Sequence, residues 1–139
     1  IENIEYKIIG VTVDFSEKDR NTIRHALIQG GKDAKYILIH VVETAGARFH
    51  GDEVLDLETQ SDTANLEKYR QNLADLGYEA EISIGYGTAA KAIADQVKDK
   101  EIELLVMGAH GHKGISDLIF GTTVDTVRHN VNIPILIIK

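Results

Sequence analysis

The chain has 139 residues, a formal net charge of −7 and no cysteine. This length suffices for one domain with a substantial core that needs neither disulfides nor metals. The lack of cysteine excludes thiol chemistry and suits a reducing cytosol. The acidic balance argues against a general nucleic-acid binder, which carries a basic face.

No apolar run approaches the roughly 18 residues of a membrane helix, and no signal-peptide pattern opens the chain. We therefore expect a cytoplasmic chain with no nucleic-acid partner and no direct membrane contact in this segment. The first residue is Ile1 rather than methionine. We expect one domain over 1–139, either trimmed or taken from a longer protein.

The first half of the chain alternates strand and helix patterns. A nearly continuous apolar run over 6–13 predicts a buried parallel strand. Ser16 with Asp19 then forms a capping-box-like helix start, and the helix ends at a glycine pair. Residues 36–42 predict a second strand, and the polar segment 43–52 predicts a flap over a site.

The second half continues the same alternation of helix and strand. In chain order we expect a helix over 53–76, an edge strand over 78–84, a helix capped by Thr88, a strand over 104–107, a helix with Val124, Val127 and Val131 inward, and a last strand over 135–138.

This order predicts an α/β fold. It is a Rossmann-like three-layer open sandwich, with a parallel sheet covered by helices on both faces. Ligands bind such sheets beyond the carboxyl ends of the strands, where the strand order reverses. If the first and fourth strands are neighbours there, Asp14 and the turn at Gly108 face the same crevice.

A glycine-rich turn after the apolar run 104–107 is the clearest chemical signal in the chain. Four of the 12 glycines fall within 14 positions, and a pair of threonines follows the last of them: Gly108, Gly111, Gly114, Gly121, Thr122 and Thr123. Glycine lets backbone N–H groups approach an anion, and threonine hydroxyls add donors. The pattern predicts a phosphate cradle, although any one of these glycines could be a simple turn residue.

The spacing Gly108-x2-Gly111-x9-Gly121-Thr122 resembles the Gly-x2-Gly-x9-Gly-Ser/Thr signature of the nucleotide-binding branch of the universal stress protein family. The likeness extends along nearly the whole chain, through ordered blocks at Tyr6-Lys7-Ile8, Val13-Asp14-Phe15-Ser16-Glu17, His40-Val41-Val42, Met107-Gly108-Ala109-His110-Gly111 and Pro134-Ile135-Leu136-Ile137. The chain departs from the pattern at Thr12, where some members have proline, and at Ala109 and His112 in the loop. These departures leave affinity and nucleotide preference open.

The resemblance implies a five-stranded parallel sheet in the order 3-2-1-4-5. It also implies binding of ATP or of AMP or ADP, and a homodimer paired through Ile135–Ile138. Mg²⁺ would accompany the nucleotide, held mainly by phosphate oxygens and water. The function implied is a regulatory stress-response module whose occupancy orders segments 43–52 and 108–121 and changes a surface that a partner or the dimer uses.

Carried over by position, the resemblance implies that Asp14 accepts hydrogen bonds from the ribose and that the backbone of Val41 contacts adenine. The phosphates would lie on the glycine amides and threonine hydroxyls. The expected cofactor-binding set is Asp14, Val41, Met107, Gly108, His110, Gly111, Gly121, Thr122 and Thr123. Two of these have ordinary alternatives: Asp14 as a turn former and Val41 as a core strand residue.

Other sites receive less support from the sequence. His110 and His112, with His50 as a third ligand, could be taken as a metal site, but a zinc site needs three or four oriented ligands, and we predict none. Gly85-x-Gly87-x-x-Ala90 matches the letters of a dinucleotide fingerprint. We interpret it as a turn because the acidic residue expected about 20 positions later is missing.

No nucleophile elbow, P-loop or evident acid–base pair occurs in the sequence, so we predict no catalytic residue. Asp117 and Asp125 are more typical of helix-end charges than of cation ligands. Two alternatives stay open. One is a slow ATPase or phosphotransferase that uses Asp117 or His110, and the other is a nucleotide-sensing domain fused to a larger protein such as a membrane transporter.

Overall fold

The computed structural model describes residues 4–43, 52–109 and 123–139. Its strands are β1 (Ile8–Thr12), β2 (Lys35–Val42), β3 (Glu79–Tyr86), β4 (Leu104–Gly108) and β5 (Ile135–Ile138). Its helices are α1 (Asp19–Gly30), the short 3-10 helix η1 (Gly31–Asp33), α2 (Asp52–Asp75), α3 (Ala89–Asp99) and α5 (Asp125–Asn130). The predicted flap falls outside these ranges except for its two end residues.

The five strands form one sheet in the order β3-β2-β1-β4-β5, with every neighbouring pair parallel. In the centre, Val11 of β1 lies opposite Leu38 of β2 on one side and Val106 of β4 on the other. The predicted fold class and strand order are confirmed. Strands β3 and β5 form the two edges, so the strand over 78–84 was correctly predicted to lie at an edge.

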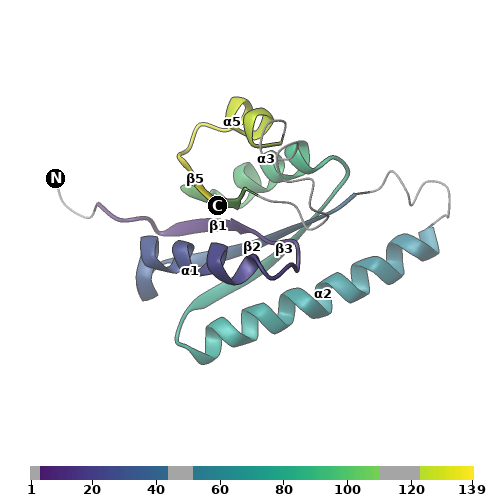
Figure 1. Ribbon diagram of the computed structural model, residues 1–139, viewed down its shortest axis with the longest axis horizontal. Helices are drawn as coiled ribbons and strands as arrows, with labels where there is room; N and C mark the ends of the chain where they lie inside the picture. The colour runs from purple at the N-terminus through teal and green to yellow at the C-terminus, as the bar shows by residue number, and fades with distance from the viewer. Residues whose placement is uncertain (1–3, 44–51, 110–122) are drawn as a thin grey trace.

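Helices cover both faces of the sheet (Figure 1), with α1 and α2 on one face and α3 and α5 on the other. Alternate residues of the central strands supply two cores. The core under α1 and α2 includes Ile9, Val11, Tyr36, Leu38, Leu66, Leu104 and Val106, and the core under α3 and α5 includes Ile37, Ile39, Ile93, Leu105, Met107 and Val127. Within the described ranges, none of the helices is both long and apolar enough to cross a membrane.

The end of α1 depends on close packing at Gly30. A Cβ added there would lie 2.5 Å from Cδ1 of Ile9, 2.7 Å from Cβ of Ala34 and 2.8 Å from the hydroxyl oxygen of Tyr36. Ile9 and Tyr36 are fully buried, so these atoms have little room to move. Glycine is therefore required at this position by the packing of α1 on β1 and β2.

We expect Gly30→Ala to lower the free energy of unfolding by about 1–3 kcal/mol, because the added methyl group overpacks the core. Urea denaturation of both proteins measures this change. Gln29→Ala, at the exposed preceding position of the same helix, is the control and should stay within about 0.5 kcal/mol of wild type. Equal stability of Gly30→Ala and Gln29→Ala would contradict this account of the helix end.

Candidate functional site

The strand order reverses between β1 and β4, which are parallel neighbours. Their carboxyl ends therefore lie at the same edge of the sheet, and this is the position at which open α/β sheets bind ligands. Asp14 follows β1 by two residues, and Gly108 is the last residue of β4. The structure thus brings these two predicted site residues to one edge.

Gly108 permits a close approach of α1 to the end of β4. A Cβ at Gly108 would lie 3.3 Å from the hydroxyl oxygen of Thr22, which is buried on α1. The preceding side chain, Met107, is 4% exposed and packs in the core under α3 and α5. Only the backbone of Met107 is therefore suited to contact a ligand at this edge.

The backbone of Val41 faces the space beyond the end of β1. The carbonyl of Ile39 accepts a hydrogen bond from the N–H of Val13 at 2.8 Å, so the peptide groups of Ile39 point toward β1. Val41 is two residues further along β2 and points the same way, since strand geometry repeats every second residue. The carbonyl of Val42 faces the other side, where it accepts from the N–H of Gly87 at 3.1 Å.

If the ladder between β1 and β2 continued, the N–H of Val41 would donate to the carbonyl of Val13. That carbonyl instead accepts from Nδ1 of His40 at 2.9 Å. The side chain of His40 thus takes the position of a ladder bond. The N–H group of Val41 therefore points past the end of β1, beyond the carboxyl ends of the central strands.

The remaining predicted site residues are only partly described. Thr123 is half-buried just before α5. His110, Gly111, Gly121 and Thr122 lie outside the described residues, as do Gly114, Asp117, His50 and His112. Asp125 is exposed and forms an ion pair with Arg128 at 2.5 Å, and the hydrogen bond from Arg128 lowers the pKa of Asp125.

The turn that carries Asp14 is held by side chains. Oδ1 of Asp14 accepts from the N–H of Ser16 at 3.0 Å. Oδ1 of Asp19 accepts from the N–H of Asp14 at 3.1 Å, and its Oδ2 accepts from the N–H of Phe15 at 2.7 Å. Phe15 has φ +66°, a left-handed conformation that is costly for a bulky residue.

The predicted capping box at Ser16 and Asp19 is wrong. The N-cap residue of α1 is Lys18, and no side chain caps it. Asp19 is the first helical residue, and its carboxylate turns back to the strand end rather than to the helix. Asp19 thus serves the turn after β1, whereas Oγ of Ser16 accepts from the N–H of Lys18 at 3.3 Å.

Asp19 is 4% exposed and also accepts from the hydroxyl of Tyr69 on α2 at 2.9 Å. Burial raises the pKa of Asp19 to about 6. The nearby charge of Asp14 adds to this rise, whereas the hydrogen bonds from the Asp14 N–H and from Tyr69 oppose it. Burial also raises the pKa of Tyr69, and the hydrogen bond to Asp19 raises it further.

His40 connects the strand end to α2. Its Nε2 lies 3.1 Å from Oδ2 of Asp62, and the two side chains are 14% and 12% exposed. Because the Val13 carbonyl can only accept, Nδ1 of His40 carries a proton. The ring of Phe15 packs between two aromatic neighbours, 4.4 Å from the ring centroid of His40 and 5.8 Å from that of Tyr69.

Sequence reasoning did not identify His40, Asp62 or Tyr69 as residues of this edge, and it gave Asp19 a different role. Two signals were present. His40 interrupts an otherwise apolar strand, and Asp62 and Tyr69 are seven residues apart, which places them on one face of a helix. Neither signal specifies a partner, because the partners come from separate elements.

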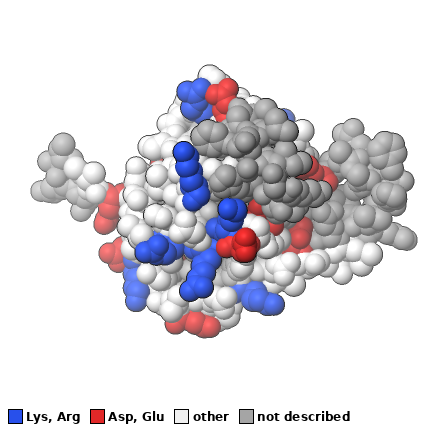
Figure 2. All heavy atoms as spheres, in the orientation of Figure 1, with Lys and Arg blue, Asp and Glu red and all other residues white. Residues whose placement is uncertain are grey.

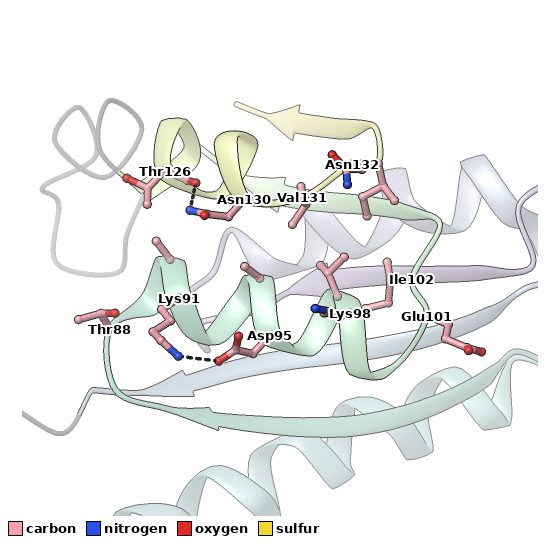
Figure 3. Close-up of a pocket in the computed structure, with 14 residues that line it drawn as sticks. Thr88, Lys91, Asp95, Lys98, Glu101, Ile102, Thr126, Asn130, Val131 and Asn132 are labelled. Carbon is pink, nitrogen blue, oxygen red and sulfur yellow. Dashed lines mark hydrogen bonds and ion pairs between the residues drawn. The ribbon is translucent and has the colours of Figure 1, made fainter.

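Elsewhere, the described surface carries charges of both signs (Figure 2) and a groove. Basic and acidic side chains are interspersed on the face shown in Figure 2. A groove of about 780 Å³ runs between α3 and α5 (Figure 3), and Lys91 and Asp95 on its α3 side form an ion pair at 3.2 Å. Its lining residues come from α3, α5 and the segments next to those helices, and Asp14, Val41 and Gly108 are not among them.

We expect the stability advantage of wild type over Asp19→Asn to shrink as pH rises from 4 to 7. The folded-state pKa of Asp19, about 6, lies above the ordinary value of 3.8, so the folded protein binds more protons in this window. The contribution of Asp19 is full below pH 4 and is lost as pH rises through 6. Urea denaturation at several pH values measures the difference.

Glu17→Gln is the matched control, since this carboxyl group is exposed just before α1. Its difference from wild type should stay constant across the same pH range. A constant difference for Asp19→Asn as well would show that burial of Asp19 does not govern its titration.

Known proteins of one family match this chain. The model of the universal stress protein family matches residues 5–139. Universal stress protein Slr1230 of Synechocystis sp. is 38% identical over 73 residues, which is 52% of this chain but only 25% of that protein. Universal stress protein MJ0577 of Methanocaldococcus jannaschii is 21% identical over 157 aligned positions that cover 99% of this chain and 97% of that one.

Solved structures share the fold. The structure of MJ0577 superposes with a TM-score of 0.84 at 24% identity, covering 98% of this chain and 97% of that one. A universal stress protein in complex with cAMP superposes with a TM-score of 0.71 at 20% identity, covering 96% and 97% of the two chains. Together with the family match over nearly the whole length, these findings show that the chain belongs to the universal stress protein family.

Proposed function

We propose that this chain binds an adenine nucleotide, with ATP as the preferred ligand, at the carboxyl edge of β1 and β4. The observation that carries the proposal is the juxtaposition at this edge of a carboxylate on a held turn, Asp14, and an outward-facing backbone amide, Val41. A carboxylate suits the hydroxyl pair of a ribose, and a backbone N–H at the end of a strand suits a ring nitrogen of adenine.

The phosphates would extend from this edge toward the loop after β4. In the proposal they lie on the amides of Gly108, Gly111 and Gly121 and on the hydroxyls of Thr122 and Thr123, with His110 alongside and Mg²⁺ bound through the phosphate oxygens. Neutral amides hold phosphate without a cluster of lysines, which agrees with the net charge of −7.

The related protein solved with cAMP supports an adenine nucleotide as the ligand class. Membership of the universal stress protein family supports a role in a stress response. We propose that the chain is a regulatory module whose occupied and empty states present different surfaces to a partner or to a second copy.

We expect Mg-ATP to bind wild type in isothermal titration calorimetry, with AMP and cAMP as comparison ligands. Asp14→Asn should raise the Kd for ATP roughly 10- to 100-fold, because an acceptor for the ribose hydroxyls is lost. Asparagine retains an oxygen that can accept from the N–H of Ser16, so the turn is kept. This makes Asp14→Asn a cleaner change than Asp14→Ala.

Asp33→Asn is the charge-matched control, because Asp33 is exposed in η1, just before β2 begins at the opposite edge of the sheet. Its Kd should remain within about twofold of wild type. No heat with any of the three ligands at millimolar concentration would refute the proposed function.

We also propose that two copies pair through β5. Strand β5 is at the sheet edge, and its apolar residues Ile135, Leu136 and Ile137 are only half-buried. The carbonyl of Pro134 accepts from Leu105 of β4, and that of Ile138 accepts from Ala109, just after β4. Ile135 and Ile137 therefore direct their backbone groups to the open edge. Such an edge can be satisfied by a second strand from another copy.

We expect Ile137→Pro to convert a dimer into a monomer in sedimentation-velocity runs at micromolar concentration. Proline removes an N–H from the open edge but none from the ladder with β4. Ile137→Val, which keeps that N–H, should remain dimeric. A wild-type chain that sediments as a monomer, or a proline variant that stays dimeric, would contradict pairing through β5.

A further inference from the structure

We propose that α2 positions the nucleotide site through two side-chain relays. The first runs from Asp62 through His40 to the carbonyl of Val13, and the second runs from Tyr69 through Asp19 to the turn at Asp14. The inference rests on the proposed function, because it concerns the same site, and it makes His40, Asp62, Asp19 and Tyr69 positioning residues for the ligand.

The first relay sets the backbone around Val13. Nδ1 of His40 donates to the Val13 carbonyl at 2.9 Å, and Asp62 holds the other ring nitrogen at 3.1 Å. Asp62 thereby orients the imidazole, as a carboxylate orients a histidine at many functional sites. His40 donates to the Val13 carbonyl, which would otherwise accept a hydrogen bond from the N–H of Val41. This relay therefore keeps the Val41 amide available to a ligand.

The second relay sets the turn that carries the ribose-binding carboxylate. The two oxygens of Asp19 accept from the amides of Asp14 and Phe15, and Tyr69 donates to Oδ2 at 2.9 Å. Without this donor, the carboxylate of Asp19 would lose one of its anchors and could rotate. The position of Asp14 therefore depends on a hydroxyl supplied by α2.

The turn needs such support because it is strained. Phe15 lies at φ +66°, and a residue of this kind persists there only when its surroundings hold it in place. Its amide bonds to Asp19, and its ring packs against those of His40 and Tyr69. Each relay thus contributes one aromatic contact to the strained residue as well as a hydrogen bond to the backbone beside it.

Both relays begin on the packed face of one helix. Asp62, Leu66, Tyr69 and Leu73 follow a spacing of three or four residues, and Leu66 and Leu73 are buried against the sheet. The face of α2 that packs on the sheet therefore also carries Asp62 and Tyr69, the residues from which the two relays start. A shift of α2 would move Asp62 and Tyr69 together. By linkage, a bound nucleotide would in turn stabilise the position of α2.

The proposal is tested with Tyr69→Phe and Asp62→Ala in the calorimetric titration with Mg-ATP. Each variant should raise the Kd roughly three- to tenfold, because only part of the free energy of a hydrogen bond to a charged group is transmitted from α2 to the ligand. Asp62→Asn should restore most of the affinity lost in Asp62→Ala, because its amide can donate to Nε2 of His40.

Tyr36→Phe is the matched control for Tyr69→Phe. Tyr36 is fully buried, and its hydroxyl donates to the carbonyl of Gly31 at 2.6 Å, next to the start of β2 and away from the site. It should lower stability while leaving the Kd within about twofold of wild type. This comparison separates a loss of packing from a loss of positioning.

A double-mutant cycle provides a readout that a purely structural role would not change. If Tyr69 acts through Asp14, Tyr69→Phe should alter the Kd less than about twofold when Asp14→Asn is already present. Two outcomes would overturn the relays while the proposed function stands, provided that wild type binds tightly. One is an unchanged Kd in Tyr69→Phe or Asp62→Ala. The other is an equal effect of Tyr69→Phe on the Kd with and without Asp14→Asn. No binding by wild type would overturn both.

Discussion

The central place of β1 is the constraint on which the rest of the structure depends. Its backbone pairs with β2 on one side and β4 on the other, and its side chains enter the buried core. The chain first builds outward through β2 and β3 and then returns to add β4 and β5. The connections after β1 and β4 therefore lead away in opposite directions, and open α/β sheets bind their ligands beyond the carboxyl ends of such a strand pair.

A strand that stops in the middle of a sheet leaves backbone groups without ladder partners. Here those groups are taken by side chains: His40 for the carbonyl of Val13, and Asp19 for the amides of Asp14 and Phe15. No buried side-chain nitrogen or oxygen in the described part of the chain lacks a hydrogen-bond partner. The buried side-chain groups at this strand end are thus satisfied, whereas the carboxylate of Asp14 and the amide of Val41 remain available.

This arrangement costs stability beside the proposed nucleotide site. Burial raises the pKa of Asp19, and Phe15 holds a left-handed backbone conformation. Both features oppose folding, and an uncharged residue with an ordinary turn would avoid them. Their presence beside Asp14 agrees with the general tendency of strain and buried charge to gather at functional sites.

The sequence by itself determined the alternation of strands and helices, because apolar periodicity and glycine placement are local properties. Through its ordered motif blocks it also indicated the family and the strand order, and with that order it predicted that Asp14 and the Gly108 turn lie at one edge of the sheet. Only the tertiary structure decided that His40 replaces a ladder bond and that Asp19 serves a turn rather than a helix cap. The reason is physical: these roles depend on Asp62 and Tyr69, which lie over 20 residues away along the chain and become partners only when α2 packs on the sheet.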